Sequence, residues 1–272
     1  MNKHCVQLIY ACLLLFTPLF INSQSTAITE KYLYLADSFI KNRQPDSAIF
    51  YLQKATPILK KEGPAESFVN TSNQLGILLT RQDKYKEALA VLNEALDAGL
   101  SQQDIPPLSV ATTHISLGVV YNAQQKYNEA LIHHHKALDI RIKLLGQTHA
   151  DVATSYGNLG NVYRNNQQFQ ESIEAHTSAM KIRETIFGLQ SPEIVESYVG
   201  LARVHKDLQD YPTALGYFEK ALKNKIIQKG EAHADLAKFY QYLSDIWYLM
   251  EDKVKGDEYK NTATKLTNGS RS

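Results

Sequence analysis

The sequence is poor in cysteine and in net charge. Of its 272 residues only Cys5 and Cys12 are cysteines. If the N-terminal segment that holds them is removed, no thiol is left, which excludes disulfides, thiolate metal sites and a thiol nucleophile. Lysine and arginine number 29, against 28 aspartates and glutamates. This balance gives no global field for nucleic acid or for an anionic membrane, so no nucleic-acid partner is expected.

Recognisable catalytic motifs are also missing. The sequence has no Gly-x-Ser-x-Gly elbow, no His-Glu-x-x-His helix, no phosphate-cradling loop and no dinucleotide fingerprint. We therefore predict a protein that is not an enzyme and needs no cofactor. Hydrophobic residues make up 44% of the chain and charged residues 21%. Such a composition can bury a core, so the chain should fold.

The N-terminus has the layout of a secretory signal peptide. Lys3 precedes an apolar run over residues 6–21, and small polar residues follow it. We assign residues 1–23 to the signal, with cleavage after Ser23 or Ser25. The mature chain is then expected to be exported, either to a periplasm or to the medium.

Two other uses of this segment are disfavoured. A membrane-spanning helix needs about 20 mostly apolar residues, and Pro18 breaks the run near its end. No stable membrane span is therefore expected after cleavage. Lipid anchoring through Cys12 is disfavoured because the strongest apolar stretch follows this cysteine instead of preceding it.

The main part of the chain is an internal repeat. A leucine followed by a small residue recurs in steps of 40, 42, 42, 42 and 42, and the small residues are Ala36, Gly76, Gly118, Gly160, Ala202 and Ser244. Nineteen residues after each of them stands an alanine. It is improbable by chance that the same leucine and the same alanine position recur in all six units. Six units are therefore expected, approximately at 29–62, 69–102, 111–144, 153–186, 195–228 and 237–266, before a polar tail at 267–272.

Each unit is expected to be a pair of helices. A small residue where the helices cross, with the alanine on the facing helix, would let the two axes approach closely. Aromatic side chains would fill the space to the next unit, so that each unit buries its apolar face only by stacking on a neighbour.

Glycine and proline mark the expected helix ends. Left-handed residues are predicted to end second helices at Gly146, Gly188 and Gly230. Thr148 and Asp151 have capping-box spacing for the next helix. Ser191 followed by a proline supplies another cap, and Pro45 and Pro212 fall in first turns of second helices. No proline is expected inside a helix.

This pattern resembles the tetratricopeptide repeat and covers residues 29–266. The period of 42 exceeds the usual 34 of that family. The most similar variant is the kinesin light chain type, with a Gly-x-x-His-x-Asp-like linker that appears here at 146–151, 188–193 and 230–235. The resemblance implies an all-α, right-handed α–α superhelix, a solenoid of about six helix-turn-helix repeats. It also implies a scaffold that binds a peptide or partner protein on a concave face formed by the first helices.

The resemblance places the groove residues on one stripe of each first helix. They are Gln74, Arg81, Asn122, Asn158, Asn161, Arg164, Asn165, Arg203 and Lys206. Asparagine amides can pair with a peptide backbone, and arginine can hold a carboxylate with two parallel bonds. Because few acids share these positions, an acidic partner segment is favoured. The alternative, that these residues only solvate the inner wall, stays open.

Two further functions stay open as alternatives. The first is a periplasmic sensor or adaptor for a membrane signalling partner. The second, from a different class, is a metal-dependent hydrolase that uses the nine histidines. Consecutive helical residues point about 100° apart, so the run 133–135 cannot converge on one ion. The repeat register instead places His134 in a packing column with His176 and Phe218.

His149 and His233 each stand two residues before an acid in two of the linkers. A catalytic interpretation would make them general bases. The interpretation favoured here is that they belong to the helix-start motif that recurs at the junctions.

Overall fold

The computed structural model describes residues 25–231 and 233–269, and in these residues every regular element is a helix and none is a strand. The predicted all-α fold is confirmed. The described chain forms two compact units, of which the first ends at Gln124 and the second begins at Gln125. The segment 1–23, predicted as a secretory signal, lies outside the described residues.

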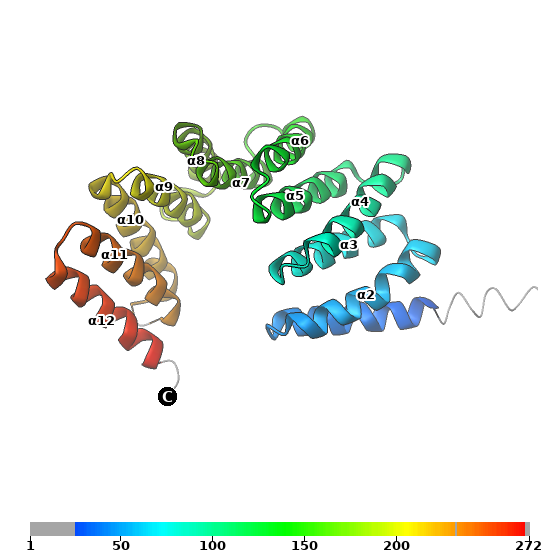
Figure 1. Cartoon of the computed structure of the whole chain (residues 1–272), viewed down its shortest axis with the longest axis horizontal. Coiled ribbons are helices and arrows are strands. Elements are labelled where there is room, and N and C mark those ends of the chain that lie inside the picture. Colours follow the sequence, from blue (N-terminus) through cyan, green and yellow to red (C-terminus); the bar gives the residue numbers. More distant parts are fainter. Residues whose placement is uncertain (1–24, 232, 270–272) are drawn as a thin grey trace, which may run out of the picture. The chain divides into compact units, whose positions relative to one another are not determined.

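The N-terminal unit begins with helical residues 25–41. The helices that follow are α2 (Pro45–Glu62), α3 (Ala65–Arg81), α4 (Tyr85–Ser101) and α5 (Pro107–Ala123). Successive helices of this unit pack side by side (Figure 1). Its core contains the fully buried Leu52, Leu79 and Leu92.

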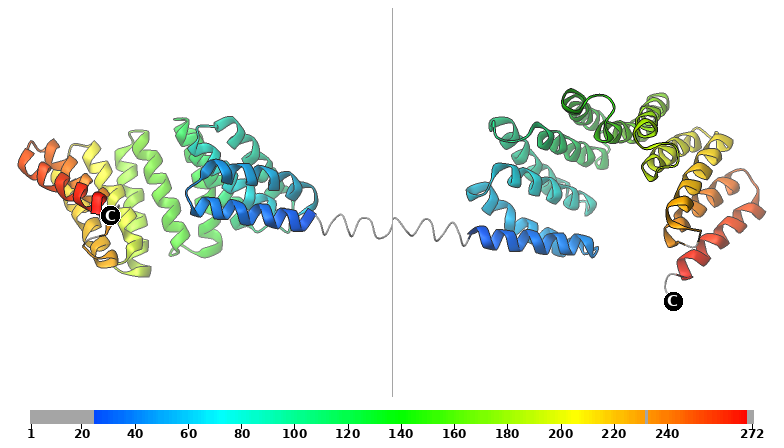
Figure 2. Two further views of the ribbon diagram at one scale, coloured as in Figure 1. Left: turned by 90° about the horizontal axis from the view of Figure 1, so that it is seen from below. Right: turned by 180° about the vertical axis from the view of Figure 1, so that it is seen from behind.

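The C-terminal unit contains the longer series of helix pairs. Its elements are α6 (Tyr127–Leu145), α7 (Ala150–Asn165), α8 (Phe169–Phe187), η1 (Pro192–Ile194), α9 (Val195–Asp207), α10 (Tyr211–Lys229), η2 (Ala234–Leu236), α11 (Ala237–Leu249) and α12 (Lys253–Gly269). The pairs α7–α8, α9–α10 and α11–α12 stack on one another, as both views of Figure 2 show. α12 runs past residue 266, where we expected the last repeat to end. None of the described helices in either unit is both long and apolar enough to span a membrane.

The turn between the two helices of a pair has a left-handed residue that is not glycine. These residues are Arg43, Asp83, Gln125, Gln167, Gln209 and Glu251, with φ between 56° and 65°. The next backbone N–H then bonds back across the turn, as from Gln168 to the carbonyl of Tyr163 (2.9 Å). This bond is the 6→1 hydrogen bond of the Schellman motif, which satisfies a carbonyl at the end of the first helix.

Glycine ends the second helices as predicted, in a different region of backbone space. Gly146, Gly188 and Gly230 have φ of 80°, 84° and 82°. Their ψ values are 169°, 164° and 161°, so the residues are extended and not left-handed helical. Because this region is essentially restricted to glycine, the requirement for glycine is stricter than expected.

Two of the predicted caps are wrong. α7 begins after His149, whose Nδ1 accepts a hydrogen bond from the N–H of Asp151 (3.1 Å), so Thr148 forms no capping box. Asp151 is the second residue of α7, one position too early for the acidic member of a capping box. Ser191 precedes the 3-10 turn η1, but its side chain does not cap it. Pro45 and Pro212 do lie in first turns.

The expectation that no proline lies inside a helix is also wrong. Pro57 lies inside α2, in the last third of the helix. Proline has no N–H to donate to the carbonyl four residues earlier. The carbonyl of Gln53 therefore receives no bond from residue 57, and the neighbouring Thr56 Oγ donates to a different carbonyl, that of Leu52 (2.7 Å).

The small residue at the helix crossing faces a large side chain and not the predicted alanine. A Cβ on Gly76 would lie 2.6 Å from Cγ of Leu92, and one on Gly160 would lie 2.7 Å from the imidazole of His176. The helix pair is therefore held close by a large residue that fills the space left by glycine.

Candidate partner-binding groove

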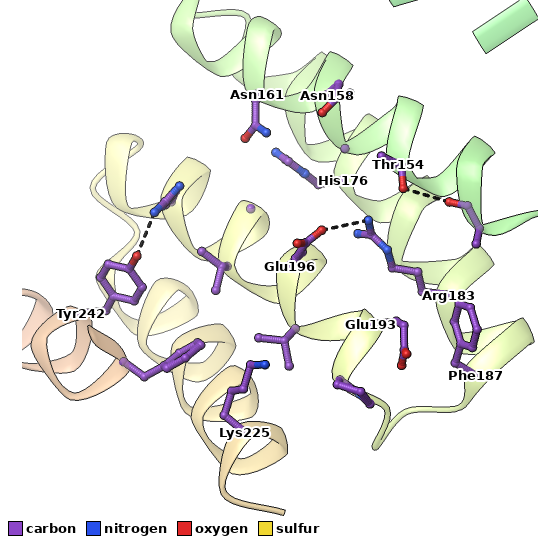
Figure 3. A pocket seen from close by; sticks show the side chains of 18 of the residues that line it. Thr154, Asn158, Asn161, His176, Arg183, Phe187, Glu193, Glu196, Lys225 and Tyr242 are labelled. Carbon is purple, nitrogen blue, oxygen red and sulfur yellow. Dashed lines mark hydrogen bonds and ion pairs between the residues drawn. The ribbon is translucent and has the colours of Figure 1, made fainter. Parts of the chain in front are cut away.

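A groove of about 650 Å³ lies in the C-terminal unit. Side chains from α7, α9 and α11, the first helices of three successive pairs, form most of its lining, and residues of α8, η1 and α10 complete it (Figure 3). First helices thus provide the wall, as the tetratricopeptide resemblance implied.

The groove brings together only some of the predicted site residues. Those that line it are Asn158, Asn161 and Arg203. The predicted residues that lie on α7 and α9 outside this lining are Arg164, Asn165 and Lys206. The predicted residues that belong to the N-terminal unit are Gln74, Arg81 and Asn122.

Asn158 and Asn161 lie on the same face of α7, one turn apart, and Figure 3 shows both beside His176. Asn158 is half-buried and Asn161 is exposed. Neither amide has a hydrogen-bond partner within the described residues. Each can therefore donate to and accept from a ligand backbone without breaking an existing bond.

Arg164 is held by an acid of the next first helix. Its Nε lies 3.0 Å from Oδ2 of Asp207; Arg164 is half-buried and Asp207 is exposed. This ion pair ties α7 to α9 and balances the charge that was expected to attract an acidic partner. The pairing was not predicted, although Asp207 lies on the predicted stripe.

Arg203 is positioned by Tyr242 of α11. Its Nη2 donates to the phenol oxygen (2.9 Å), and its guanidinium lies 5.5 Å from the ring centroid. The tyrosine ring is itself stacked on Phe218 at 4.9 Å. Because Tyr242 is neutral, it fixes the orientation of the guanidinium without offsetting its positive charge.

His176 of α8 extends between two first helices to the floor of the groove. Its side chain is buried, and Nε2 has no hydrogen-bond partner within the described residues. Gly160 of α7 and Gly200 of α9 contact the ring, and a Cβ on either would overlap it. Burial, helped by three nearby arginines, lowers the pKa of His176 to about 4, so the imidazole is neutral at pH 7.

A buried arginine joins α8 to α9 below the groove. Arg183 Nη1 donates to Ser197 Oγ (2.7 Å), and Nη2 lies 3.3 Å from Oε2 of Glu196. Burial lowers the pKa of Arg183, and Glu196 opposes that shift. The same device occurs 42 residues earlier, where Arg141 Nη1 donates to Ser155 Oγ (3.0 Å).

Basic side chains outnumber acidic ones around the groove. The basic residues of the lining are Arg183, Arg203, Lys225 and Lys238, and the acidic ones are Glu193 and Glu196. Because Glu196 already pairs with Arg183, the remaining charge is positive. The groove therefore has the sign that suits an acidic ligand.

The family model of the tetratricopeptide repeat matches residues 109–184 and 151–226. Residues 109–226 are tetratricopeptide repeats. This range contains α7 and α9 and therefore two of the three helices that form the groove wall. No curated protein matches the chain.

Several solved structures share the fold of this chain. BtubC (BKLC) from P. vanneervenii is 19% identical, with a TM-score of 0.69 over 85% of this chain and 92% of that one. A putative kinesin light chain with TPR-like repeats from Podosopora anserina is 20% identical, with a TM-score of 0.60 over 77% and 99%. The apo form of RapI is 16% identical, with a TM-score of 0.59 over 89% and 98%. The predicted tetratricopeptide solenoid is confirmed.

The histidines of these repeats have structural positions. His134 is fully buried, and His149 and His233 each accept a hydrogen bond from the backbone N–H two residues later, at 3.1 Å. The last two cap the starts of α7 and η2, as the helix-start interpretation predicted. Within the described ranges, no group of three histidine, cysteine, aspartate or glutamate side chains could hold a metal ion.

Several groove residues were not predicted, among them His176, Gly200 and Tyr242. The tetratricopeptide stripe does contain residues 200 and 242, which stand two before the small residue of their repeats. His176 was assigned to a packing column, where it does lie. The signal that could have revealed its position in the groove is the glycine at 200, where the other repeats have Tyr34, Gln74, Ser116, Asn158 and Tyr242.

Proposed function

We propose that this chain is an exported, non-catalytic interaction module that holds an extended segment of a partner protein in the groove formed by α7, α9 and α11. Tetratricopeptide repeats are a protein-binding fold, and the groove is lined mostly by first helices.

One observation carries the proposal. Asn158 and Asn161 project from adjacent turns of α7 into the groove with unpaired amides, opposite the oriented guanidinium of Arg203. Amides at this spacing can hold the backbone of an extended peptide, whose own N–H and C=O groups need partners once water is displaced. If these residues only solvated the groove, nothing would require α7 to carry unpaired amides and α9 to carry a guanidinium with a fixed orientation.

The partner segment is proposed to be acidic. Arg203, Lys225 and Lys238 line the groove, and Glu193 is the acid that no ion pair within the described residues neutralises. Electrostatic attraction of this kind accelerates association and selects against basic segments. Binding should therefore weaken as salt rises.

The test is affinity capture from the cells that make the protein, with the mature chain and two variants as baits. Asn158→Ala with Asn161→Ala removes the groove amides. Asn128→Ala with Gln170→Ala removes two exposed amides of second helices as a matched control. The proposal expects the first variant to lose the partner and the control to retain it. Equal capture by all three baits would reject the groove as the binding site.

Export is tested separately. Expression of the full chain in an exporting host, followed by intact mass measurement of the recovered protein, should show the loss of residues 1–23. Recovery of the uncleaved chain from the cytoplasmic fraction would reject export while leaving the groove proposal intact.

A further inference from the structure

We propose that the N-terminal end of the repeat array is a docking face for an amphipathic helix of a partner protein, which places an acidic side chain against Lys31. The face consists of Ile28, Lys31 and Leu35. They lie on the first helix of the chain, residues 25–41, which is the dark-blue helix beside α2 in Figure 1. This end face belongs to the N-terminal unit and the groove to the C-terminal unit, so the inference does not rest on the proposed groove function.

The repeat register shows that this face is covered in every later repeat. Ile28 stands eight residues before the small residue of its repeat, and it is 43% exposed. The equivalent residues are at most 6% exposed, and they are Phe68, Val110, Val152, Ile194 and Leu236. Leu35 is half-buried, whereas the equivalent leucines are at most 4% exposed, and they are Leu75, Leu117, Leu159, Leu201 and Leu243. No helix pair precedes the first repeat within the described residues, so these two side chains stay uncovered.

The cover in the later repeats is the second helix of the preceding repeat. Leu222 of α10 belongs to one apolar cluster with Leu236 and Leu243, which hold the positions of Ile28 and Leu35 in the last repeat. Helices α6 and α7 share an apolar cluster in the same way. The end face therefore has the apolar side chains against which a helix like α10 packs.

Lys31 determines the charge of the helix that fits. The later repeats have uncharged residues at its position, all at most 5% exposed, and they are Thr71, Thr113, Ser155, Ser197 and Phe239. Lys31 is exposed and forms no ion pair with any residue that the structure describes.

The contact of α8 with α9 shows which residue of the incoming helix meets this position. Arg183 of α8 donates to Ser197 of α9 at 2.7 Å, and Ser197 stands where Lys31 stands in the first repeat. A cation at the position of Arg183 would repel Lys31, whereas an acid would form an ion pair with it. The aliphatic part of Lys31 could then pack beside Ile28 and Leu35.

A second copy of this chain fits the end face poorly. At the opposite end of the array, α12 has Lys260 and Thr264 where α10 has Phe218 and Leu222, and both are exposed. Head-to-tail contact would therefore bring no apolar stripe. Head-to-head contact about a two-fold axis would bring together the Lys31 side chains of the two copies, because Lys31 lies in the middle of the face. The partner is therefore a different protein.

The probe is a synthetic peptide of residues 211–229, the sequence of α10, with Lys225→Glu. Phe218 and Leu222 supply its apolar stripe, and the substituted position is equivalent to Arg183 of α8. A matched peptide has Lys223→Glu instead. It has the same composition and net charge, with the acid about 200° away around the helix. Because helix formation costs both peptides about the same, their affinities compare the position of the acid.

Binding to the mature chain is followed by the methyl NMR resonances of Ile28 and Leu35. Ile132, which is 54% exposed on α6, provides the reference methyl group. We expect the Lys225→Glu peptide to shift both end-face resonances and to leave that of Ile132 unchanged. It should bind about fivefold more tightly than the Lys223→Glu peptide, near the upper limit for a partly exposed ion pair.

A charge reversal on the protein tests the pairing with Lys31. Lys31→Glu should weaken the Lys225→Glu peptide and strengthen the unsubstituted peptide, which keeps its lysine at that position. Lys41→Glu makes the same change in net charge on the same helix outside the end face, and it should leave the preference unchanged. Both lysines are exposed, so neither substitution removes a packing contact of the core.

Three results would overturn the proposal: equal binding of the two substituted peptides, no change of preference in Lys31→Glu, or unshifted Ile28 and Leu35 resonances. Sedimentation of the mature chain alone should show a monomer. A concentration-dependent dimer that Ile28→Ser abolishes would assign the face to a second copy and would also overturn the proposal. These results leave the groove untouched, since capture with the asparagine variants tests it.

Discussion

Gly160 and His176 lie so close that a Cβ on residue 160 would be 2.7 Å from the imidazole Nε2. The contact joins α7 to α8 inside one helix pair, and it replaces the glycine–alanine contact that the repeat pattern predicted. The glycine is required because a large ring fills the crossing point.

Gly160→Ala should therefore destabilise the protein. The added methyl group must displace a buried ring, and overpacking of this kind costs about 1–3 kcal/mol. Gly157→Ala is the control, since it lies one turn away in the same helix and an added Cβ there meets nothing within 4 Å. That change should raise the unfolding free energy by about 0.5–1 kcal/mol, because alanine is the better helix former. Urea denaturation followed by circular dichroism measures both. Equal effects of the two substitutions would contradict the close contact.

The turns within the pairs offer a stabilising substitution. Gln167 has φ of 61°, a left-handed conformation that costs a non-glycine residue about 1–2 kcal/mol. Gln167→Gly should remove that strain and, after the loss of chain entropy, raise the unfolding free energy by about 0.5–1 kcal/mol.

Gln170→Gly is the matched change inside α8, and it should lower the unfolding free energy by about 1 kcal/mol. Thermal unfolding of the two variants beside the parent chain compares them directly. If both glycines destabilise, the left-handed turn at Gln167 is wrong.

The unfolding free energy should fall as the pH is lowered, because two buried histidines must then take up protons. Burial lowers the pKa of both His134 and His176 to about 4, from an ordinary value of 6.5. Between these values the unfolded chain binds more protons than the folded one, so the unfolding free energy rises with pH. The stabilisation is complete above pH 6.5 and is lost as pH falls towards 4, by up to about 3 kcal/mol for each histidine.

Leucine at both positions tests this dependence. Leu92 holds the same register position in the second repeat, so His134→Leu with His176→Leu copies an existing contact. The double variant should lose much of the slope of unfolding free energy against pH between 4 and 6.5. A slope equal to that of the parent would show that other groups cause the acid sensitivity.

The buried Arg183 below the groove should contribute more to stability than its half-buried counterpart, Lys225. Arg183→Ala leaves the fully buried hydroxyl of Ser197 without its partner and should cost about 2 kcal/mol. Lys225 occupies the same position 42 residues later and bonds only to Gln228 of its own helix. Lys225→Ala should therefore change the unfolding free energy by less than about 0.5 kcal/mol. Chemical denaturation of the two variants provides the comparison.

The sequence predicts the helix pairs and their spacing well because both depend on many equivalent positions of the aligned repeats. The glycines at 146, 188 and 230 also follow from the sequence, since their backbone conformation excludes other residues. The turn at Gln167 does not, because a glutamine carries no local sign of a positive φ. The sequence placed His149 in the helix-start motif but assigned the side-chain cap to Thr148, because an imidazole is an uncommon N-cap.

The groove was predicted less completely, for a physical reason. A stripe of one helix predicts which side chains face the concave wall, and it identified Asn158, Asn161 and Arg203. It cannot show that Arg164 is neutralised by Asp207, which lies 43 residues away on another helix. Nor can it show that His176, a second-helix residue, reaches the groove through the space left by two glycines.

The central claim is that a partner lies against α7 and α9, and site-specific photo-crosslinking tests it most directly. A photoreactive phenylalanine analogue is placed at residue 161, in the groove, or at residue 170, on the exposed face of α8, and irradiated in the native cell. We predict a crosslinked partner from position 161 and none from position 170. A partner captured at 170 and absent at 161 would contradict the account.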